Sequence, residues 1–114
     1  MSEKQATLLE TVHEIEKMLN ENPEPISDVQ LIYEFQITGD EAGTFQLHLQ
    51  DGQAKVTEEA TSPPDCTLIM SFDSFQKFLD GKLSGTAAFM TGKLKVKGEI
   101  PKALKLESIL KQYH

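Results

Sequence analysis

The apolar positions of this chain change their spacing several times, and each change marks an expected element of structure. In the first twenty residues apolar side chains recur every three or four positions, which predicts an amphipathic helix. The residues of this stripe are Leu8, Val12, Ile15 and Leu19. Ser2 and Gln5 have the spacing of a capping box at its start. Pro23 ends the helix, because proline disfavours helical geometry in the residue before it.

A period of two then replaces the helical period and predicts four strands, each with one buried face. These strands are expected over residues 29–37, 44–50, 53–59 and 66–72. Asp51-Gly52 is expected to join the second strand to the third in a tight hairpin, because both residue types tolerate the positive φ of such turns.

The helical period returns after residue 72. Asp73 is the expected N-cap of a short helix, and Gly81 is the expected residue that ends it. A second short helix is expected over residues 86–90 and a fifth strand over residues 93–97. Pro101 suits the first turn of a last helix. The apolar side of that helix comprises Ala103, Leu106, Ile109, Leu110 and Tyr113.

The expected order of elements predicts an α+β fold. It is one helix, four strands, two short helices, a fifth strand and a last helix. Short connections between consecutive strands favour antiparallel pairing, and the helices must cover one apolar face of the sheet. No linker or internal repeat divides the sequence. We therefore expect residues 1–114 to form a single domain.

Charge narrows the classes of partner. The net charge is −7 and every basic residue is a lysine. This composition argues against nucleic acid, whose recognition favours positive charge and arginine. Residues 1–80 carry sixteen acidic side chains and four lysines, a net −12, whereas residues 81–114 carry seven lysines and two acids, a net +5. The chain therefore has an acidic front and a basic end section.

Catalytic and metal-binding patterns are not apparent in the sequence. His13, His48 and His114 stand in no metal-ligand motif, and Cys66 lies in an apolar strand as an expected inert core thiol. The chain has no G-x-S-x-G motif for a serine nucleophile. We therefore expect no enzyme activity, no metal and no cofactor. One cysteine, a polar beginning and no long apolar run lead us to expect a cytoplasmic protein.

Two features of the second half each have two interpretations. The apolar residues between 72 and 90, which include five of the chain's phenylalanines and methionines, form either a filled core or a partly hollow interior that accepts an acyl chain. Lys93, Lys95 and Lys97 alternate along the last strand. They either protect an exposed sheet edge from aggregation or attract the anionic headgroups of lipids.

The second half also carries an extended family resemblance. The run Ala88-Phe-Met-Thr-Gly-Lys-Leu-Lys-Val-Lys-Gly98, followed by Ala103-Leu-Lys-Leu106, resembles the sterol-carrier-protein type-2 family. The resemblance is specific over residues 65–106 and agrees in layout over nearly the whole chain. Ser84-Gly85-Thr86 departs from the Asn-Pro type of turn often found there. With neither a peroxisomal Ser-Lys-Leu ending nor an attached enzyme domain, the chain is similar to prokaryotic-type, stand-alone members.

The resemblance implies a five-stranded, mainly antiparallel sheet with helices on one face and an apolar tunnel between the two layers. It implies that the tunnel binds a long-chain lipid: a fatty acid, a fatty acyl-CoA, or a sterol or isoprenoid. The residues expected to contact this ligand are Phe35, Leu47, Met70, Phe75, Phe78, Leu79, Phe89, Met90, Leu94, Val96, Leu106, Ile109 and Leu110.

The main functional hypothesis is therefore non-catalytic binding and transfer of a long-chain lipid. The alternative is an accessory scaffold that presents an isoprenoid or quinone-type intermediate to partner enzymes. A small hydrolase or thioesterase is the third hypothesis, and no positioned nucleophile and base support it. Lipid-metabolism enzymes and a transient contact with an anionic membrane surface are the partners that these hypotheses leave open.

Overall fold

The computed structural model describes residues 8–39, 42–58 and 62–113. The three longer helices are α1 (Leu8–Glu21), α2 (Phe72–Leu79) and α4 (Ile100–Lys111). Two further short elements, the 3₁₀ helix η1 (Glu24–Ile26) and the helix α3 (Gly85–Met90), connect the larger ones. The strands are β1 (Leu31–Thr38), β2 (Gly43–Gln50), β3 (Gln53–Thr57), β4 (Cys66–Ser71) and β5 (Leu94–Gly98).

The five strands form one sheet in the order β3-β2-β1-β4-β5. The pairs β1–β2, β2–β3 and β4–β5 are antiparallel, whereas β1 and β4 are parallel. Strands β2 and β3 therefore extend the sheet on one side of β1, and β4 and β5 extend it on the other side. The sequence-based prediction of an α+β fold with a mainly antiparallel, five-stranded sheet is confirmed.

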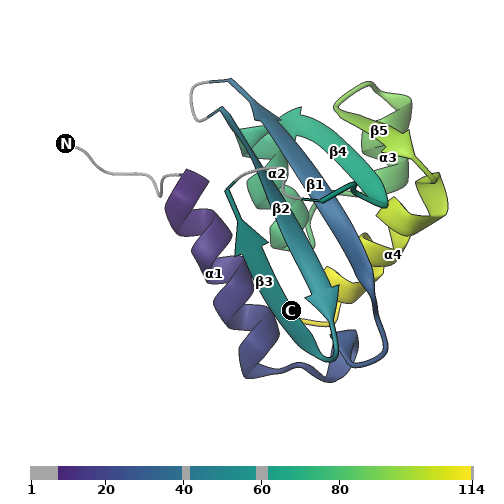
Figure 1. The fold of residues 1–114 in the computed structure, drawn as a ribbon. Coiled ribbons are helices and arrows are strands. Elements are labelled where there is room, and N and C mark those ends of the chain that lie inside the picture. The colour runs from purple at the N-terminus through teal and green to yellow at the C-terminus, as the bar shows by residue number, and fades with distance from the viewer. Residues whose placement is uncertain (1–7, 40–41, 59–61, 114) are drawn as a thin grey trace.

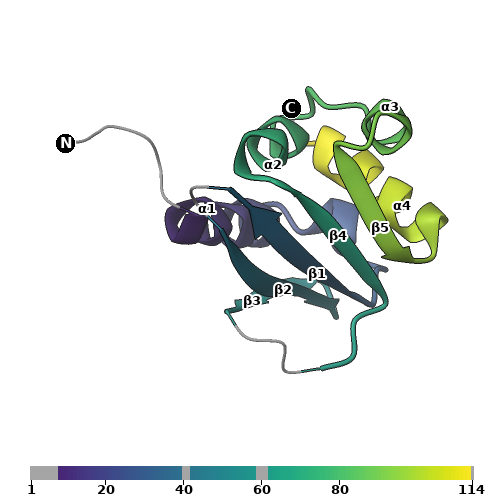
Figure 2. The ribbon, with the colours of Figure 1, turned by 90° about the horizontal axis from the view of Figure 1, so that it is seen from above.

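The helices lie on one face of this sheet (Figures 1 and 2). Helix α1 packs along β3, and α2 and α4 pack over β4. The first strand places its apolar side chains alternately on this face, so that Tyr33, Phe35 and Ile37 are buried there. The predicted packing of the helices on a single apolar face is thus confirmed.

Three aromatic rings occupy the centre of the interior. Phe35 of β1 stacks on Phe45 of β2, with ring centroids 5.0 Å apart and planes 13° from parallel. Phe75 of α2 packs against both rings, at 5.3 Å from Phe35 and 5.5 Å from Phe45. Such tilted and edge-on contacts suit the charge distribution of aromatic rings. This cluster holds α2 against the middle of the sheet.

Side chains of α1 also satisfy the exposed edge of β3. The side-chain amide of Asn20 donates to the Ala54 carbonyl at 2.9 Å and accepts from the Ala54 N–H at 2.8 Å. The Glu16 carboxylate accepts from the Val56 N–H at 2.8 Å. Because these contacts occupy the hydrogen-bonding groups of an edge strand, they fix α1 in place and protect the edge from pairing with another chain.

On the opposite face of the sheet, a polar network is buried where the alternating pattern predicted exposed polar residues. Gln46 is fully buried, and its amide donates to the Glu34 carboxylate at 3.0 Å and to the Ser62 carbonyl at 2.8 Å. The Ser62 N–H donates back to the Gln46 side-chain oxygen at 3.3 Å. Ser62, which precedes β4, therefore covers Gln46 on this face.

Some element boundaries differ from the sequence-based prediction. Asp73 was wrong as the N-cap of α2, because the chain is still extended at Ser71 and the Ser71 hydroxyl accepts from the Ser74 N–H at 3.2 Å. Asp73 instead lies in the first turn and pairs with Lys77 at 3.2 Å. The expected capping box at Ser2 and the last predicted residue of the third strand, Glu59, lie outside the described residues.

A buried phenol connects the sheet to the last helix. The Tyr33 hydroxyl donates to the Lys102 carbonyl of α4 at 2.7 Å. Burial raises the pKa of this phenol above its ordinary value, and the neighbouring Cys66 and Asp65 act in the same direction. The bond therefore depends on a protonated tyrosine.

Replacing Phe75 with alanine is expected to destabilise the fold by about 3–5 kcal/mol, because it empties the centre of the aromatic cluster. The matched control is Phe89→Ala, whose ring is partly exposed and whose loss should cost less than about 1 kcal/mol. Urea unfolding followed by circular dichroism measures both values. Equal losses for the two variants would contradict the central role of Phe75.

Tyr33 should make the fold sensitive to alkali. A phenol with a raised pKa keeps its proton longer in the folded state than in the unfolded chain. Its contribution is therefore complete below about pH 10, the ordinary tyrosine value, and is lost progressively above it. Tyr33→Phe should cost about 1 kcal/mol at neutral pH through the lost hydrogen bond and flatten this alkaline decline. Tyr113→Phe, at a more exposed hydroxyl, is the control and should flatten it less.

Candidate lipid-binding site

A small apolar cleft opens between α3, β5 and α4. Its volume is about 110 Å³, and only apolar atoms form its exposed walls. The lining residues of this apolar cleft are Gly85, Thr86, Phe89, Leu94, Val96, Ile100, Ala103 and Leu104. Leu94 and Ala103 are also part of the buried core, so core side chains form the inner wall of the cleft.

Local sequence explains how the cleft forms. Alternation along β5 turns Leu94 and Val96 towards the helices and leaves Lys93, Lys95 and Lys97 exposed. The chain passes from α3 to β5 through Gly92, whose φ of +80° is costly for any residue with a side chain.

Helix α3 is anchored to α4 by one carboxylate. The Gly85 N–H donates to Oε1 of Glu107 at 3.0 Å, and Oε2 of Glu107 pairs with Lys111 at 2.9 Å. Glycine at residue 85 leaves room for this contact, because an added Cβ would displace the Glu107 carboxylate. The Ser84 hydroxyl caps the helix by accepting from the Ala87 N–H at 3.2 Å. The Ser-Gly-Thr turn therefore allows α3 to lie directly against α4.

Exposed apolar side chains surround the mouth of the cleft. Among the described residues, five large apolar side chains are exposed, and four of them lie in α3 and the first turns of α4. We call these four the apolar rim: Phe89, 42% exposed, Met90, 79%, Ile100, 40%, and Leu104, 37%. Three of the four, all except Met90, also line the cleft.

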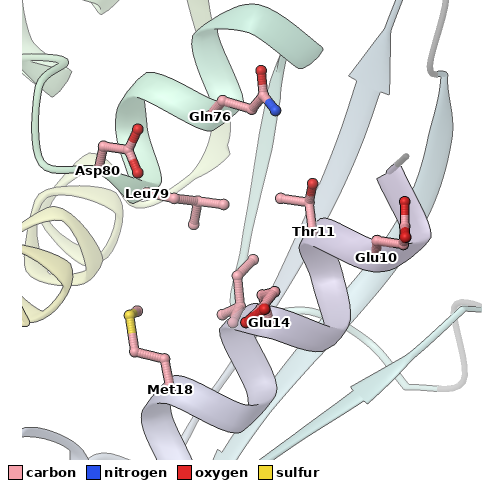
Figure 3. Close-up of a pocket in the computed structure, with 8 residues that line it drawn as sticks. Glu10, Thr11, Glu14, Met18, Gln76, Leu79 and Asp80 are labelled. Carbon is pink, nitrogen blue, oxygen red and sulfur yellow. The ribbon is translucent and has the colours of Figure 1, made fainter. Parts of the chain in front are cut away.

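A larger hollow lies between α1 and α2 (Figure 3). This groove measures about 650 Å³, and Ile15, Met18 and Leu79 supply its apolar surface. Figure 3 shows Leu79 and Met18 directed into the space between the two helices. Its other lining residues are polar or acidic: Glu10, Thr11, Glu14, Gln76 and Asp80. We call it the acidic groove, and its carboxylates disfavour an anionic headgroup.

The structure distributes the predicted ligand-contact residues over three places and the core. Phe89, Leu94 and Val96 meet in the apolar cleft, and Leu79 lines the acidic groove. Met90 is exposed at the apolar rim. The remaining eight are buried in the core between sheet and helices: Phe35, Leu47, Met70, Phe75, Phe78, Leu106, Ile109 and Leu110. Contact of these residues with a ligand, and a continuous tunnel, remain predictions.

Sequence reasoning did not include five residues of the cleft in the expected site. They are Gly85, Thr86, Ile100, Ala103 and Leu104. Ile100 and Leu104 stand four residues apart, outside the stripe formed by Leu106 and Ile109. An apolar pair on a second face of a helix is a signal that would have indicated them.

The described residues show little reactive chemistry near the cleft. Burial raises the pKa of the Cys66 thiol, whose sulfur lies 3.8 Å from the Glu99 carbonyl oxygen. The thiol is therefore protonated and unreactive at neutral pH. Within residues 8–39, 42–58 and 62–113, no three His, Cys, Asp or Glu side chains gather to hold a metal ion. None of the helices in these ranges is long and apolar enough to cross a membrane.

Curated relatives contain a similar sequence but are much longer. The "Hydroxysteroid dehydrogenase-like protein 2" of Xenopus tropicalis is 40% identical over 112 residues. The match covers 97% of this chain and 26% of the relative. The chain thus spans about a quarter of the length of the curated relatives it matches first. The expectation of a stand-alone domain therefore remains untested.

Solved structures share the whole fold. Sterol carrier protein domain 2 of Helicoverpa armigera is 28% identical with a TM-score of 0.75, and the match covers 99% of this chain and 94% of that one. Sterol carrier protein 2 from Yarrowia lipolytica is 30% identical with a TM-score of 0.72, with 99% and 98% coverage. The sequence profile described as "SCP-2 sterol transfer family" matches residues 12–111, which include every element that forms the apolar cleft. The chain belongs to the SCP-2 sterol transfer family.

Proposed function

We propose that this protein binds a long-chain lipid without modifying it and transfers it, with the apolar cleft as the opening through which the lipid passes. The observation that carries the proposal is a cleft walled only by apolar atoms and lined in part by core side chains of an SCP-2 domain. Apolar burial contributes roughly 25 cal/mol per Å², so a hydrocarbon tail inside the domain needs few polar contacts.

The cleft must widen to admit such a ligand. Its volume of about 110 Å³ is below the roughly 300–1,000 Å³ typical of ligand pockets. Helix α3 is the wall best suited to move, because it has only six residues and two of them are buried. Its attachments include the Gly85–Glu107 bond and the Lys93 N–H, which donates to the Ala88 carbonyl at 2.8 Å. An outward shift of α3 would join the cleft to the core.

The distribution of charged side chains favours one orientation of a bound anionic lipid. An anionic headgroup is favoured at this edge of the sheet, where Lys93, Lys95 and Lys97 are exposed along β5 on the face opposite Leu94 and Val96. The same headgroup is disfavoured at the acidic groove, which Glu14 and Asp80 help to line. We therefore propose a fatty acid or fatty acyl-CoA with its tail inside and its head at the basic end.

The lining of the cleft supports a carrier better than a hydrolase. The eight residues that line it include no histidine, cysteine, carboxylate or lysine, and Thr86 carries the only side-chain polar group among them. Acid–base catalysis needs a titratable group within hydrogen-bond reach of the reacting atom. We accordingly propose that acyl-CoA is bound without turnover.

We propose that the protein transfers its lipid to an enzyme. The curated relatives contain a segment about 40% identical to this chain within much longer proteins whose name includes dehydrogenase. A lipid held near the surface by a short helix suits such a handover. We therefore propose enzymes of lipid metabolism as partners.

The test fills the cleft with a larger side chain at Ala103. Ala103→Leu adds bulk to the floor of the cleft and keeps a good helix former in α4. Binding of a fluorescent fatty acid should weaken by about tenfold or more, since the tail loses roughly 1.4 kcal/mol or more of burial. Thermal unfolding of the variant checks that it remains folded.

The matched control is Met18→Phe, which adds bulk to the acidic groove instead. It should leave fatty-acid binding unchanged. Loss of binding in Met18→Phe with full binding in Ala103→Leu would move the site to the groove. Displacement of the probe by oleate, oleoyl-CoA, cholesterol and a quinone, each measured separately, ranks the classes of lipid. Failure of all four to displace it would overturn the proposal.

A further inference from the structure

We infer that the chain carries a second binding site, a polar pocket that binds the phosphate group of a small molecule. The pocket measures about 300 Å³ and shares no lining residue with the apolar cleft. The inference therefore goes beyond the proposed function and stands whether or not the cleft accepts a lipid. We call this site the hydroxyl–lysine pocket, after the polar side chains that line it: Thr38, Ser71, Ser74, Lys93 and Lys95.

The hydroxyl–lysine pocket lies at the end of the sheet where three strands and a helix meet. Strands β1 and β4 are parallel, so their carboxyl ends lie together, and Thr38 stands opposite Ser71 in the register. Strand β5 starts at the same end, because it runs antiparallel to β4, and α2 begins directly after β4. Crevices outside the carboxyl ends of neighbouring parallel strands are frequent ligand sites.

One buried hydroxyl in this pocket has no partner among the described residues. Ser74 lies in the first turn of α2 and is 8% exposed. Its N–H donates to the Ser71 hydroxyl at 3.2 Å, but its own hydroxyl forms no hydrogen bond with any residue that the structure describes. Burial of an unsatisfied hydroxyl is costly, and folded proteins rarely retain one without a use for it. Ser74 therefore indicates a ligand that accepts its proton.

Two lysines give the pocket a positive charge. Lys93 and Lys95 are exposed and form no ion pair with any residue in the described part of the chain. None of the residues that line the pocket is acidic. Asp73 lies in the first turn of α2, but it does not line the pocket and pairs with Lys77 at 3.2 Å. The positive end of the α2 dipole acts in the same direction as the lysines, so the pocket favours an anion.

A phosphate group uses these donors more fully than a carboxylate does. A phosphate monoester carries a charge of about −1.5 to −2 at neutral pH and has three terminal oxygens that accept hydrogen bonds. Two ammonium groups balance this charge, and the Thr38 and Ser74 hydroxyls can donate to the oxygens. The Ser71 hydroxyl accepts from Ser74 and still has its own proton to donate. A carboxylate, with one charge and two oxygens, would leave part of this set unused.

The experiment is a titration with sodium phosphate, followed by NMR of the backbone amides, with sodium chloride at equal ionic strength as the reference. Amide signals of residues 71–74 and 92–95 should shift saturably with phosphate only. Lys95→Gln should weaken binding by about fivefold or more, because a charged donor is lost. The matched control is Lys97→Gln, which removes the same charge from the same strand but does not line the pocket. It should bind within about twofold of the wild type, since solvent and salt screen a charge at that distance.

Ser74→Ala separates binding from a structural role. The variant should bind phosphate about tenfold more weakly, because a hydrogen bond to a charged group is lost. In phosphate-free buffer it should unfold at a temperature no lower than the wild type does, since the hydroxyl bonds to no described residue. A lower unfolding temperature together with unchanged phosphate affinity would show that the hydroxyl supports the fold alone and would overturn the inference.

Three further probes identify the molecule that carries the phosphate. Tighter binding of coenzyme A than of dephospho-coenzyme A assigns the pocket to the ribose phosphate of a nucleotide. Tightest binding of glycerol 3-phosphate assigns it to the headgroup of a lipid, and equal affinity for all the probes assigns it to free phosphate. Each of these results supports a phosphate pocket.

The inference fails if chloride reproduces the phosphate-induced shifts or if acetate binds as tightly as phosphate. It also fails if Lys97→Gln loses as much affinity as Lys95→Gln, because the attraction would then come from the general charge of the strand. Fatty-acid binding by the Ala103→Leu variant reports on the cleft alone, since Ala103 does not line this pocket. Failure of the phosphate pocket and failure of the carrier proposal are therefore distinguishable.

Discussion

Contact of Phe75 with Phe35 and Phe45 determines where the second half of the chain lies. The three rings join α2 to the two central strands with centroid distances of 5.0–5.5 Å. Because β4 enters the sheet beside β1 and runs directly into α2, this contact also orients the three elements that come after α2 in the chain. The cleft lies between these three elements, α3, β5 and α4. Its position therefore depends on the aromatic cluster.

Sequence reasoning was most successful where burial depends on period. The alternation through Tyr33, Phe35 and Ile37 predicted which face of β1 is buried, since a one-residue shift would expose every one of these side chains. It was less successful in choosing the residue that caps a helix, because that choice depends on local backbone geometry. Ser71 and Asp73 are both good caps, and only the extended backbone at Ser71 determines which of them begins α2.

The candidate site was only partly predictable for a related reason. The family resemblance indicated Phe89, Leu94 and Val96, which the structure brings together, but it also indicated Phe75, which packs against Phe35 in the core. An apolar side chain has the same pattern whether it faces a ligand or a neighbour. The role of Glu107 depends on a backbone N–H at Gly85, and a sequence pattern does not show such tertiary contacts.

The covered outer face of the sheet has a consequence for the path of a ligand. Gln46 is bonded to Glu34 and to both backbone groups of Ser62, so the middle of that face is occupied by polar atoms that are already satisfied. A hydrocarbon chain arriving from this direction would have to separate these partners and leave them without replacements, at about 1–3 kcal/mol for each group. Under the proposed function, a lipid tail therefore reaches the interior from the helical side of the sheet.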